Sequence, residues 1–547
     1  MGKHAFAEQL VAAGVHHVFG NPGTTEQALI DVLQDYPELD LVLALHEGVA
    51  VGAAEGWARA AGWPAFVLLH TAPGLGNAMG MLANASLGHT PMVVYVGDMP
   101  RTGRFQEPAL SGPIVEMARP VSRWVHEVRT ADEIPQVLRR AFKVAMQEPR
   151  GPVVVVVPAD VMDEPTEAPI LPPSYVTPAL TVEPSALEAA ADVVAGALRP
   201  AIVVADGVAA SGALTEIGEL ADLLGAPIHQ GYATEVCVMP GHPLDAGPLP
   251  LFDPAALSRR LADHDCVLAF GTEVFKQAFP DSETPLDPAV PVVHVGLDPW
   301  ELAKNQPSLA IQAHPGRVAA ELRRLLEARA GKEFFAERRD AEIARIREDR
   351  NRRENAARMN WDATPMTAAR AVHELSMALP EDAIVADESV SASPWVQHYL
   401  RPGPGSWFRS RGGGLGAGMS IAVGLQIACP DRPVYSLVGD GSAMYTVTAL
   451  WTAAHHGLPV TWVVLNNRSY RMLKLNVLDY LGTGVSGRRF VGADLVDPSI
   501  DFVHLANSLG VAALRVESAA AVGLALRERT SHPGPFLIEL QVDGAVG

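Results

Sequence analysis

Residues 434–442 read VYSLVGDGS, an apolar run of strand length that ends in an aspartate between two glycines. Residues 460–467 read VTWVVLNN, a second run of this kind that ends in two asparagines. Between them, apolar residues recur at helical spacing from Ala443 to His456, so the segment predicts a β-α-β unit. A crossover of this kind makes its two strands parallel, and Asp440 and Asn467 should therefore emerge at the same edge of one sheet.

The same rhythm of short apolar runs and small-residue helical stretches recurs along the chain. Further strand-like runs cover residues 41–45, 65–69, 92–96, 200–205, 266–271, 290–295 and 383–386. This alternation predicts three consecutive doubly wound α/β domains with parallel sheets. We expect a first domain at residues 1–175, a middle domain at 183–330, a charged helical connector at 331–360 and a third domain at 361–547.

The composition indicates a compact protein of enzyme size, because 48% of the 547 residues are apolar and only 19% are charged. The formal net charge of −20 disfavours nucleic acid and anionic membranes as partners. Charges of both signs are mixed in residues 321–358, where Glu348 and Arg352, and Glu354 and Arg358, are spaced for pairing on a solvated helix.

No apolar run approaches the roughly 20 residues that a membrane span needs, so we expect no membrane segment. The three cysteines, at positions 237, 266 and 429, are widely spaced. That spacing favours neither a disulfide framework nor a thiolate metal site, and it predicts a cytoplasmic protein.

The aspartate and the asparagine offer hard oxygen ligands, which suit Mg²⁺ shared with a phosphate group better than zinc. The glycines on either side of Asp440 allow backbone N–H groups to approach phosphate oxygens, and Ser442 adds a hydroxyl donor. An isolated Gly-Asp-Gly is more often a simple turn with a local cap. The asparagine pair one crossover later favours a site for metal and diphosphate.

The string GDGS, followed one crossover later by NN, resembles the motif of thiamine diphosphate enzymes. The likeness covers nearly the whole chain and is strongest to the benzoylformate decarboxylase branch of the 2-oxo acid decarboxylases. It implies pyrimidine-binding, middle and diphosphate-binding domains in that order, with thiamine diphosphate and Mg²⁺ as cofactors. By this resemblance Asp440, Asn467 and the carbonyl of Ser469 would hold Mg²⁺. The implied contacts of the diphosphate are Ser391, Gly441, Ser442 and Tyr470.

Ser391 also fits such a role on its own, because hydroxyls at 389–393 follow a predicted strand where the next helix begins. Helix capping is the alternative for these serines. Residues 412–416 read GGGLG and resemble the family stretch in which a glycine carbonyl meets the aminopyrimidine and a bulky aliphatic residue bends the cofactor. Gly413 and Leu415 fall at those positions. A flexible turn is the alternative.

Glu47 follows the run 41–45 and opens a helix of small residues. A carboxylate there is expected to be partly desolvated, which favours its protonated form near neutral pH. In the resembling family this glutamate protonates N1′ of the pyrimidine and thereby creates the base that removes the C2 proton. Stabilisation of the helix N-terminus by a negative charge is the alternative.

His70 ends the run 65–69 and lies in LHTAPGLGNAMG, which resembles the decarboxylase version of this string, where the histidine is catalytic. Acetolactate synthases carry a hydroxyl residue there, and a lone strand-end histidine is usually structural. Asn77 in the same string is an implied cofactor contact. Thr24, in GNPGTTE at 20–26, matches a family serine whose hydroxyl meets the substrate. The glycine spacing after His70 does not fit a dinucleotide-binding motif.

These features predict non-oxidative decarboxylation of a 2-oxo acid to an aldehyde, with carboligation when a second carbonyl compound intercepts the intermediate. Ala278 stands where the resemblance implies a second catalytic histidine. The pocket positions Met472 and Asn476 also differ from the small and aromatic residues of aryl-selective relatives. An aromatic or an aliphatic substrate, and an acetolactate synthase-like carboligase, therefore stay open.

A flavin-dependent oxidase on this scaffold would need a nucleotide site in the middle domain, but residues 201–307 contain no convincing glycine motif. A non-catalytic protein on the same scaffold is the last alternative. The resemblance also implies that the unit with Glu47 faces the metal unit of a second chain. A homodimer would then be the smallest active form, with a homotetramer as the expected assembly and a small 2-oxo acid as substrate.

Overall fold

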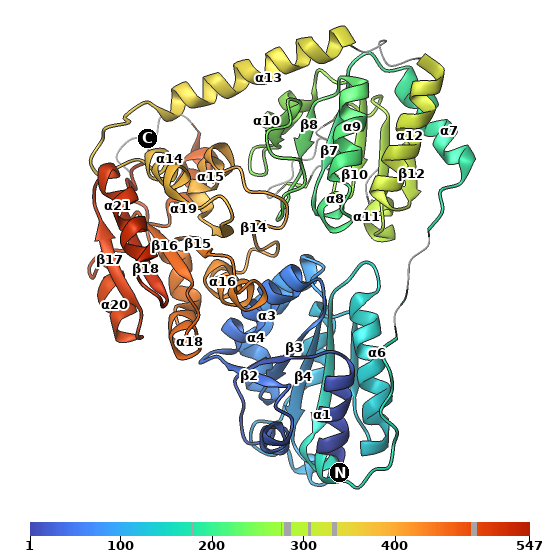
Figure 1. The fold of residues 1–547 in the computed structure, drawn as a ribbon, viewed down its shortest axis with the longest axis vertical. Helices are drawn as coiled ribbons and strands as arrows, with labels where there is room; N and C mark the ends of the chain where they lie inside the picture. Colours follow the sequence, from blue (N-terminus) through green and yellow to red (C-terminus); the bar gives the residue numbers. More distant parts are fainter. Residues whose placement is uncertain are drawn as a thin grey trace. The chain divides into compact units, whose positions relative to one another are not determined.

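A computed structural model describes residues 1–174, 176, 180–274, 276–277, 286–304, 308–330, 336–482 and 489–546. The chain forms two compact units: residues 1–177, 361–400 and 408–547 make the first, and residues 178–360 and 401–407 make the second. Three six-stranded sheets with surrounding helices lie within the described ranges (Figure 1). The predicted fold class, three doubly wound α/β domains, is confirmed.

The first sheet has the strand order β2-β1-β3-β4-β6-β5, and all its strand pairs are parallel. Its strands are β1 (His17–Gly20), β2 (Asp40–Leu43), β3 (Ala65–Leu69), β4 (Met92–Asp98), β5 (Trp124–Glu127) and β6 (Pro152–Pro158). Its helices are α1 (Gly2–Ala12), α2 (Gln27–Val32), α3 (Glu47–Ala61), α4 (Thr71–Leu87), α5 (Ile114–Ala118) and α6 (Ile134–Met146). The central strands are apolar throughout because helices cover both faces of a parallel sheet.

The middle sheet, in the second unit, has the order β12-β11-β10-β7-β8-β9. Its strands are β7 (Pro200–Val204), β8 (Ile228–Gln230), β9 (Asp245–Pro248), β10 (Cys266–Phe270), β11 (Val292–Gly296) and β12 (Leu309–Gln312). Its helices are α7 (Pro184–Ala195), α8 (Asp206–Ala210), α9 (Leu214–Leu224), α10 (Pro254–Leu261), α11 (Pro299–Lys304) and α12 (Pro315–Ala330). This sheet has an apolar core of its own, built from β7, β10 and the helices beside them.

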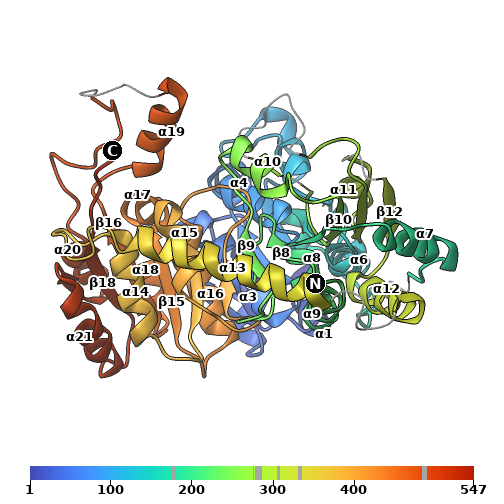
Figure 2. The same ribbon diagram turned by 90° about the horizontal axis from the view of Figure 1, so that it is seen from above.

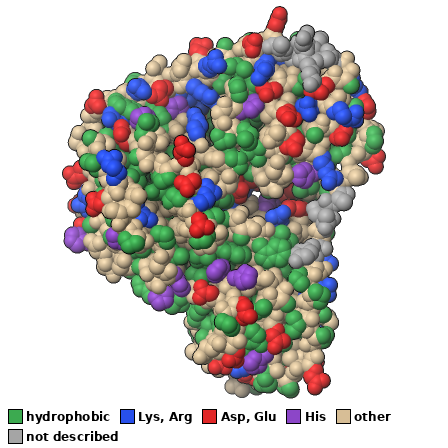
Figure 3. Space-filling model, viewed as in Figure 1, with side chains coloured by type: hydrophobic (Ala, Val, Ile, Leu, Met, Phe, Trp, Pro, Cys, Tyr) green, Lys and Arg blue, Asp and Glu red, His purple; other side chains and the backbone are tan. Residues whose placement is uncertain are grey.

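The charged segment forms the long helix α13 (Ala336–Ala357), which belongs to the second unit (Figure 2). Arg352 pairs with Glu348 at 3.0 Å and Arg358 pairs with Glu354 at 2.6 Å, so both expected ion pairs form. On the face drawn in Figure 3, basic and acidic side chains are interspersed over the region of this helix.

The third sheet, in the first unit, has the order β14-β13-β15-β16-β18-β17. Its strands are β13 (Ile384–Glu388), β14 (Trp407–Phe408), β15 (Val434–Gly439), β16 (Thr461–Asn466), β17 (Ala512–Val516) and β18 (Phe536–Gln541). The helices of this part are α14 (Ala368–Ala378), α15 (Ser393–Tyr399), α16 (Ala417–Ala428), α17 (Asp440–Ala443), α18 (Ala449–His455), α19 (Arg471–Leu481), α20 (Phe502–Ser508) and α21 (Ala519–Thr530). Strands β15 and β16 pair in parallel, as the β-α-β pattern predicts.

Helices α3 and α16 join the first and third sheets into one unit and lie side by side in both views (Figures 1 and 2). Alanine, glycine and valine make up most of α3 and half of α16, and both helices contribute to one continuous apolar core with the two sheets. Small side chains let the two helix backbones approach closely. The within-chain contact of these sheets therefore depends on the small-residue helix that follows Glu47.

One predicted element is wrong. Residues 443–456 do not form a single helix, because α17 ends at Ala443, a short 3-10 turn follows, and α18 begins only at Ala449. At the break, the Thr446 hydroxyl donates to the carbonyl of Gly416 at 2.5 Å. A tertiary hydrogen bond thus outweighs the helical spacing of the apolar residues.

Within the described residues, no helix combines the length and apolar character needed to cross a lipid bilayer.

Candidate functional site

The predicted metal-binding side chains of the third domain lie together. Asp440 follows β15 and is only 3% exposed. Its Oδ1 accepts the N–H of Gly441 at 2.9 Å, and its Oδ2 accepts the N–H of Ser469 at 3.3 Å. The amide oxygen of Asn467, after β16, accepts the same Ser469 N–H at 2.9 Å. A carboxylate oxygen and an amide oxygen from neighbouring strand ends therefore converge on one backbone donor.

The residues at this point fit a divalent cation of the Mg²⁺ type. Burial raises the pKa of Asp440 to about 6, even though backbone N–H groups donate to it. A desolvated carboxylate in this state gains from a cation placed beside it. The available donors are oxygens, which Mg²⁺ prefers to nitrogen or sulfur. Asp440, Asn467 and Ser469 would hold such an ion.

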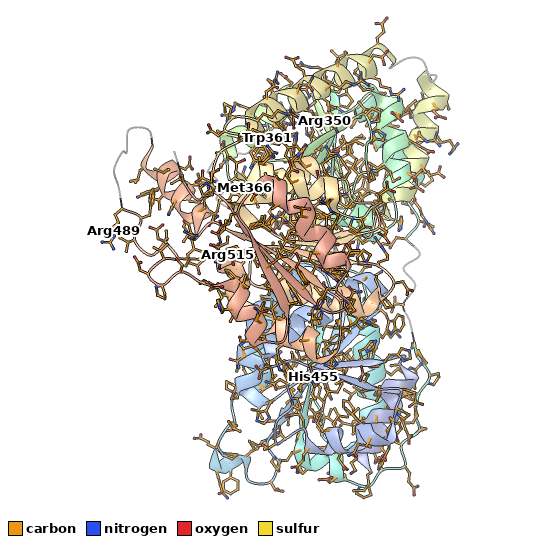
Figure 4. The ribbon with its side chains drawn as sticks, turned by 60° about the vertical axis from the view of Figure 1, so that its left-hand side comes forward. Arg350, Trp361, Met366, His455, Arg489 and Arg515 are labelled. Atoms are coloured by element: carbon orange, nitrogen blue, oxygen red, sulfur yellow. The ribbon has the colours of Figure 1, made fainter. Side chains whose placement is uncertain are left out.

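A second set of polar residues supports the turn at residues 466–469, which carries the candidate metal ligands Asn467 and Ser469 and is called the metal loop below. Asn466 donates from its amide nitrogen to Glu539 at 2.7 Å, and Glu539 is fully buried. The other oxygen of Glu539 accepts from Arg515 at 3.0 Å, and Figure 4 shows this arginine on the sheet. Arg468 has a positive φ of 55°, and its N–H donates to the Asn466 side chain at 3.1 Å. These bonds hold the turn that carries Asn467.

The predicted diphosphate contacts surround the same loop. Ser442 is buried within α17, and the Tyr470 ring packs directly over Gly441. A Cβ at Gly441 would lie 2.9 Å from the ring Cδ1 of Tyr470, so a larger residue would displace this ring. Burial, followed by the proximity of Tyr445, raises the pKa of the Tyr470 hydroxyl above its ordinary value. Gly441, Ser442 and Tyr470 thus form one compact cradle beside Asp440.

The three serines after β13, at positions 389, 391 and 393, differ in their contacts. The hydroxyls of Ser389 and Ser393 both donate to the buried Asp387, at 2.6 and 3.2 Å. Ser391 lies between them on the short 3-10 helix Val390–Ala392 and is half-buried. The capping interpretation is therefore wrong for the two flanking serines, whose partner is a side chain, and the diphosphate contact of Ser391 stays a prediction.

The loop 412–416 is held by Glu388 at the end of β13. One Glu388 oxygen accepts the N–H of Gly416 and the other that of Gly418, each at 2.8 Å. Gly413 has a positive φ of 77° and is exposed, and Leu415 is half-buried. Burial raises the pKa of Glu388 to about 7, and the two backbone donors only partly oppose this shift.

The raised pKa of Glu388 predicts a pH dependence of stability. Between its ordinary value of 4.5 and about 7, the folded chain binds more protons than the unfolded chain, so stability falls as pH rises through this window. Because the side chain is only half-buried, we expect a discounted effect of about 1 kcal/mol. Glu388→Gln should reduce the loss of melting temperature between pH 5 and pH 8. An unchanged pH dependence would contradict this assignment.

Glu47 of the first domain is the first residue of α3 and is 7% exposed. The His46 ring accepts the N–H of Gly48 at 3.0 Å and caps the helix. Asn77, two turns into α4, donates from its amide nitrogen to a Glu47 oxygen at 3.0 Å. The structure thus brings Glu47 and Asn77 together, and the amide fixes the carboxylate's orientation.

His70 follows β3 and precedes α4, and its ring pairs with a carboxylate that the sequence did not single out. Its Nδ1 lies 2.8 Å from a Glu26 oxygen and 3.2 Å from the Thr25 hydroxyl. Glu26 is fully buried and also accepts the N–H of Gly23 at 2.8 Å. A carboxylate only accepts hydrogen bonds, so it selects the tautomer that is protonated on Nδ1 and leaves Nε2 for a ligand.

Thr24 is exposed, whereas its neighbour Thr25 is buried and contacts both His70 and Glu26. Sequence reasoning missed Thr25 and Glu26. The signal in the sequence was their place after the strand-end turn GNPG, which follows the strand next to the one before His70, but this place does not show that Glu26 is buried.

Met472 and Asn476 are both half-buried on α19, one turn apart and therefore on one face. This helix begins directly after Tyr470, so its first turns, which carry the proposed pocket residues, continue from the metal loop. Ala278, the position of the expected second histidine, lies outside the described residues.

Comparisons with known proteins show the family of the three domains. Family models match the N-terminal TPP binding domain of thiamine pyrophosphate enzymes at residues 1–110, the central domain at 187–322 and the C-terminal TPP binding domain at 389–540. Benzoylformate decarboxylase of Pseudomonas aeruginosa is 33% identical over 96% of each chain. A Mycobacterium tuberculosis protein, named provisionally as acetolactate synthase large subunit IlvX, is 33% identical over 100% of each chain.

The fold comparison gives the same result at full length. The solved structure of the Rhodococcus jostii RHA1 thiamine diphosphate-dependent 4-hydroxybenzoylformate decarboxylase matches with a TM-score of 0.85. It is 30% identical, and the match covers 99% of each chain. Three observations support one family. The three domains occur in the family order, the relatives match along the whole length, and an oxygen-rich loop follows β15 and β16. This chain belongs to the thiamine pyrophosphate enzyme family.

Proposed function

We propose that this protein catalyses the thiamine diphosphate- and Mg²⁺-dependent, non-oxidative decarboxylation of a 2-oxo acid. The pairing of His70 with the buried Glu26, at the end of β3 in the same domain as Glu47, carries this proposal. A histidine in a defined tautomer at that place can transfer a proton to a reaction intermediate. The similarity to benzoylformate decarboxylases supports the same activity, with carboligation of aldehydes as a side reaction.

Each cofactor group has candidate ligands in the third domain. Asp440, Asn467 and the Ser469 carbonyl would hold Mg²⁺, and the cradle of Gly441, Ser442 and Tyr470 would receive the diphosphate together with Ser391. Gly413 and Leu415 would contact the pyrimidine. When bound, thiamine diphosphate supplies a nucleophilic carbon and takes up the electrons released with CO₂.

The first domain would supply the proton transfers. Glu47 would share its proton with N1′ of the pyrimidine, and Asn77 keeps the carboxylate in place. His70 would present Nε2 to the substrate, with the Thr24 hydroxyl as a second polar contact. Met472 and Asn476 would face the substrate's side chain and so determine which 2-oxo acid fits.

Replacing Glu26 with Gln should impair turnover through His70. The amide offers an N–H as well as an oxygen, so it no longer selects the His70 tautomer. We expect kcat to fall about ten- to a hundredfold, part of the ~10²–10⁴ that a positioned proton-transfer group provides, with KM for the 2-oxo acid nearly unchanged. The measurement is a steady-state pH–rate profile. A wild-type kcat and profile would contradict this role, and Glu26→Asp, which keeps an acceptor-only group, should retain more activity than Glu26→Gln.

The resemblance and the exposed apolar surface beside the metal loop together support a homodimer. Leu473, Val477 and Tyr480 are 53, 40 and 88% exposed and recur along one face of α19. Tyr445, near the cradle, is 56% exposed. Large apolar side chains gathered in this way are typical of an interaction surface. We propose that a second copy covers them and that two such dimers form a tetramer, which sedimentation analysis of the holoenzyme tests.

Acetolactate synthase-like carboligation is the second candidate, because IlvX is as similar to this chain as the benzoylformate decarboxylase. His70 favours decarboxylation, since acetolactate synthases resemble this chain but carry a hydroxyl residue at that point. Incubation with pyruvate or benzoylformate, Mg²⁺ and thiamine diphosphate separates the two. We expect CO₂ and the matching aldehyde. Acetolactate as the main product would favour the second candidate, and cofactor binding without turnover on a broad 2-oxo acid panel would indicate a non-catalytic protein.

A further inference from the structure

Helix α4 contacts functional residues of two different domains. Asn77 on this helix donates to Glu47. Asn84, seven residues further on, lies against the loop 412–416 of the third domain. Seven residues make about two helical turns, so both amides project from the same face of α4. The helix that begins beside His70 therefore also contacts the loop proposed to hold the pyrimidine.

The contact of Asn84 with this loop is a two-way hydrogen bond. The Asn84 amide nitrogen donates to the Gly414 carbonyl at 2.9 Å, and the Asn84 amide oxygen accepts the Gly414 N–H at 2.9 Å. Asn84 is fully buried. Because both backbone groups of Gly414 depend on one side chain, its loss would leave a donor and an acceptor unpaired. Gly413 and Leu415 are the two residues on either side of Gly414.

The glycines of the loop are required by this contact. A Cβ at Gly412 would lie 2.7 Å from the Cα of Asn84, and a Cβ at Gly414 would lie 2.9 Å from the Gly80 carbonyl. Both distances are shorter than real Cβ contacts, and the neighbouring atoms are backbone atoms of a packed helix. The glycine run therefore serves the approach of the loop to α4, and not only its approach to a ligand.

We propose that Asn84 is a positioning residue that fixes the loop 412–416 against α4 and so places the Gly413 carbonyl and the Leu415 side chain for the pyrimidine. Glu388 fixes the far end of the loop through the Gly416 N–H, so the segment between them is held at both ends. This inference rests on the proposed cofactor role of Gly413 and Leu415. It adds a residue of the first domain that acts on the cofactor through the third domain.

The test compares Asn84→Leu with Gln9→Leu in the full-length protein. Gln9 is a matched control, because it is 1% exposed and forms the same two-way pairing with Leu171, at 2.9 and 2.8 Å, far along the chain from the loop. Both changes remove a buried amide and its two hydrogen bonds to backbone groups. The readouts are melting temperature, thiamine diphosphate affinity in excess Mg²⁺ by calorimetry, and the rate of C2 deuterium exchange at saturating cofactor by NMR.

We expect both variants to melt at lower temperature, but only Asn84→Leu should lose at least tenfold in affinity and in exchange rate. A second variant, Gly412→Ala, pushes the loop away while Asn84 stays intact, and it should show the same losses if Asn84→Leu does not fold. Gly523→Ala on α21 is its control, because the added Cβ meets only the tip of Arg527, at 3.6 Å.

Affinity and exchange at wild-type levels in Asn84→Leu or Gly412→Ala would overturn the role of Asn84, as would equal losses in Gln9→Leu. Failure of the unchanged protein to bind thiamine diphosphate would instead contradict the proposed function.

Discussion

Glu47→Gln is expected to abolish C2 deuterium exchange of the bound cofactor while cofactor binding stays measurable. Glu47 is 7% exposed and is oriented by Asn77, so the variant keeps the size of the side chain and an oxygen that can accept from Asn77, but not its acid–base function. The expected loss is about 10²–10⁴-fold, the usual contribution of a positioned proton-transfer group. The measurement is exchange by NMR, with affinity measured by calorimetry on the same samples.

Glu55→Gln provides the matched control for this experiment. Glu55 is fully buried on the same helix and lies 3.6 Å from Arg59, two turns away from Glu47. Its replacement should lower the melting temperature without slowing exchange at saturating cofactor. Retained exchange in Glu47→Gln would remove this residue from the proton transfer.

Asp440→Asn is expected to raise the Mg²⁺ concentration required for thiamine diphosphate binding by at least about a hundredfold. The substitution keeps the shape of the side chain but removes the negative charge that a buried divalent cation requires. The single amide oxygen can accept only one of the two N–H groups, of Gly441 and Ser469, that the carboxylate accepts. A titration of Mg²⁺ at fixed thiamine diphosphate, followed by tryptophan fluorescence, measures the shift.

Asp206→Asn tests whether any strand-end carboxylate would give this result. Asp206 follows β7 in the middle sheet and accepts hydrogen bonds from the Thr234 N–H and hydroxyl, each at 2.6 Å. Its replacement should leave the Mg²⁺ requirement unchanged. Binding of thiamine diphosphate by Asp440→Asn at wild-type Mg²⁺ concentrations would exclude this aspartate as a ligand. Treatment of the wild type with EDTA should abolish cofactor binding, and added Mg²⁺ should restore it.

The sequence was sufficient to predict the positions of these strands, because strands buried on both faces of a parallel sheet are apolar throughout. The run at 65–69 is β3 without any shift of its ends, and the runs that precede Asp440 and Asn467 are β15 and β16. Parallel pairing then places the two strand ends at one edge. The convergence of Asp440 and Asn467 on Ser469 follows from local pattern and topology alone.

The break in residues 443–456 was not predictable in this way. Helical spacing reports only which side chains face a core, and it carries no information about the Gly416 carbonyl that binds Thr446 thirty residues away. Glu26 was missed for a similar reason. A glutamate after a turn is usually a surface residue, and only its burial against His70 gives it a role.

What the sequence alone determined is the order of the three domains, the strands whose ends carry Asp440, Asn467 and His70, and the helix that Glu47 opens, because these depend on periodicities of two to four residues. Only the tertiary structure decided which neighbours these residues meet: Glu26 at His70, Asn77 at Glu47 and Asn84 at Gly414. Such contacts join residues 30 to 330 positions apart, and the packing of whole elements selects them.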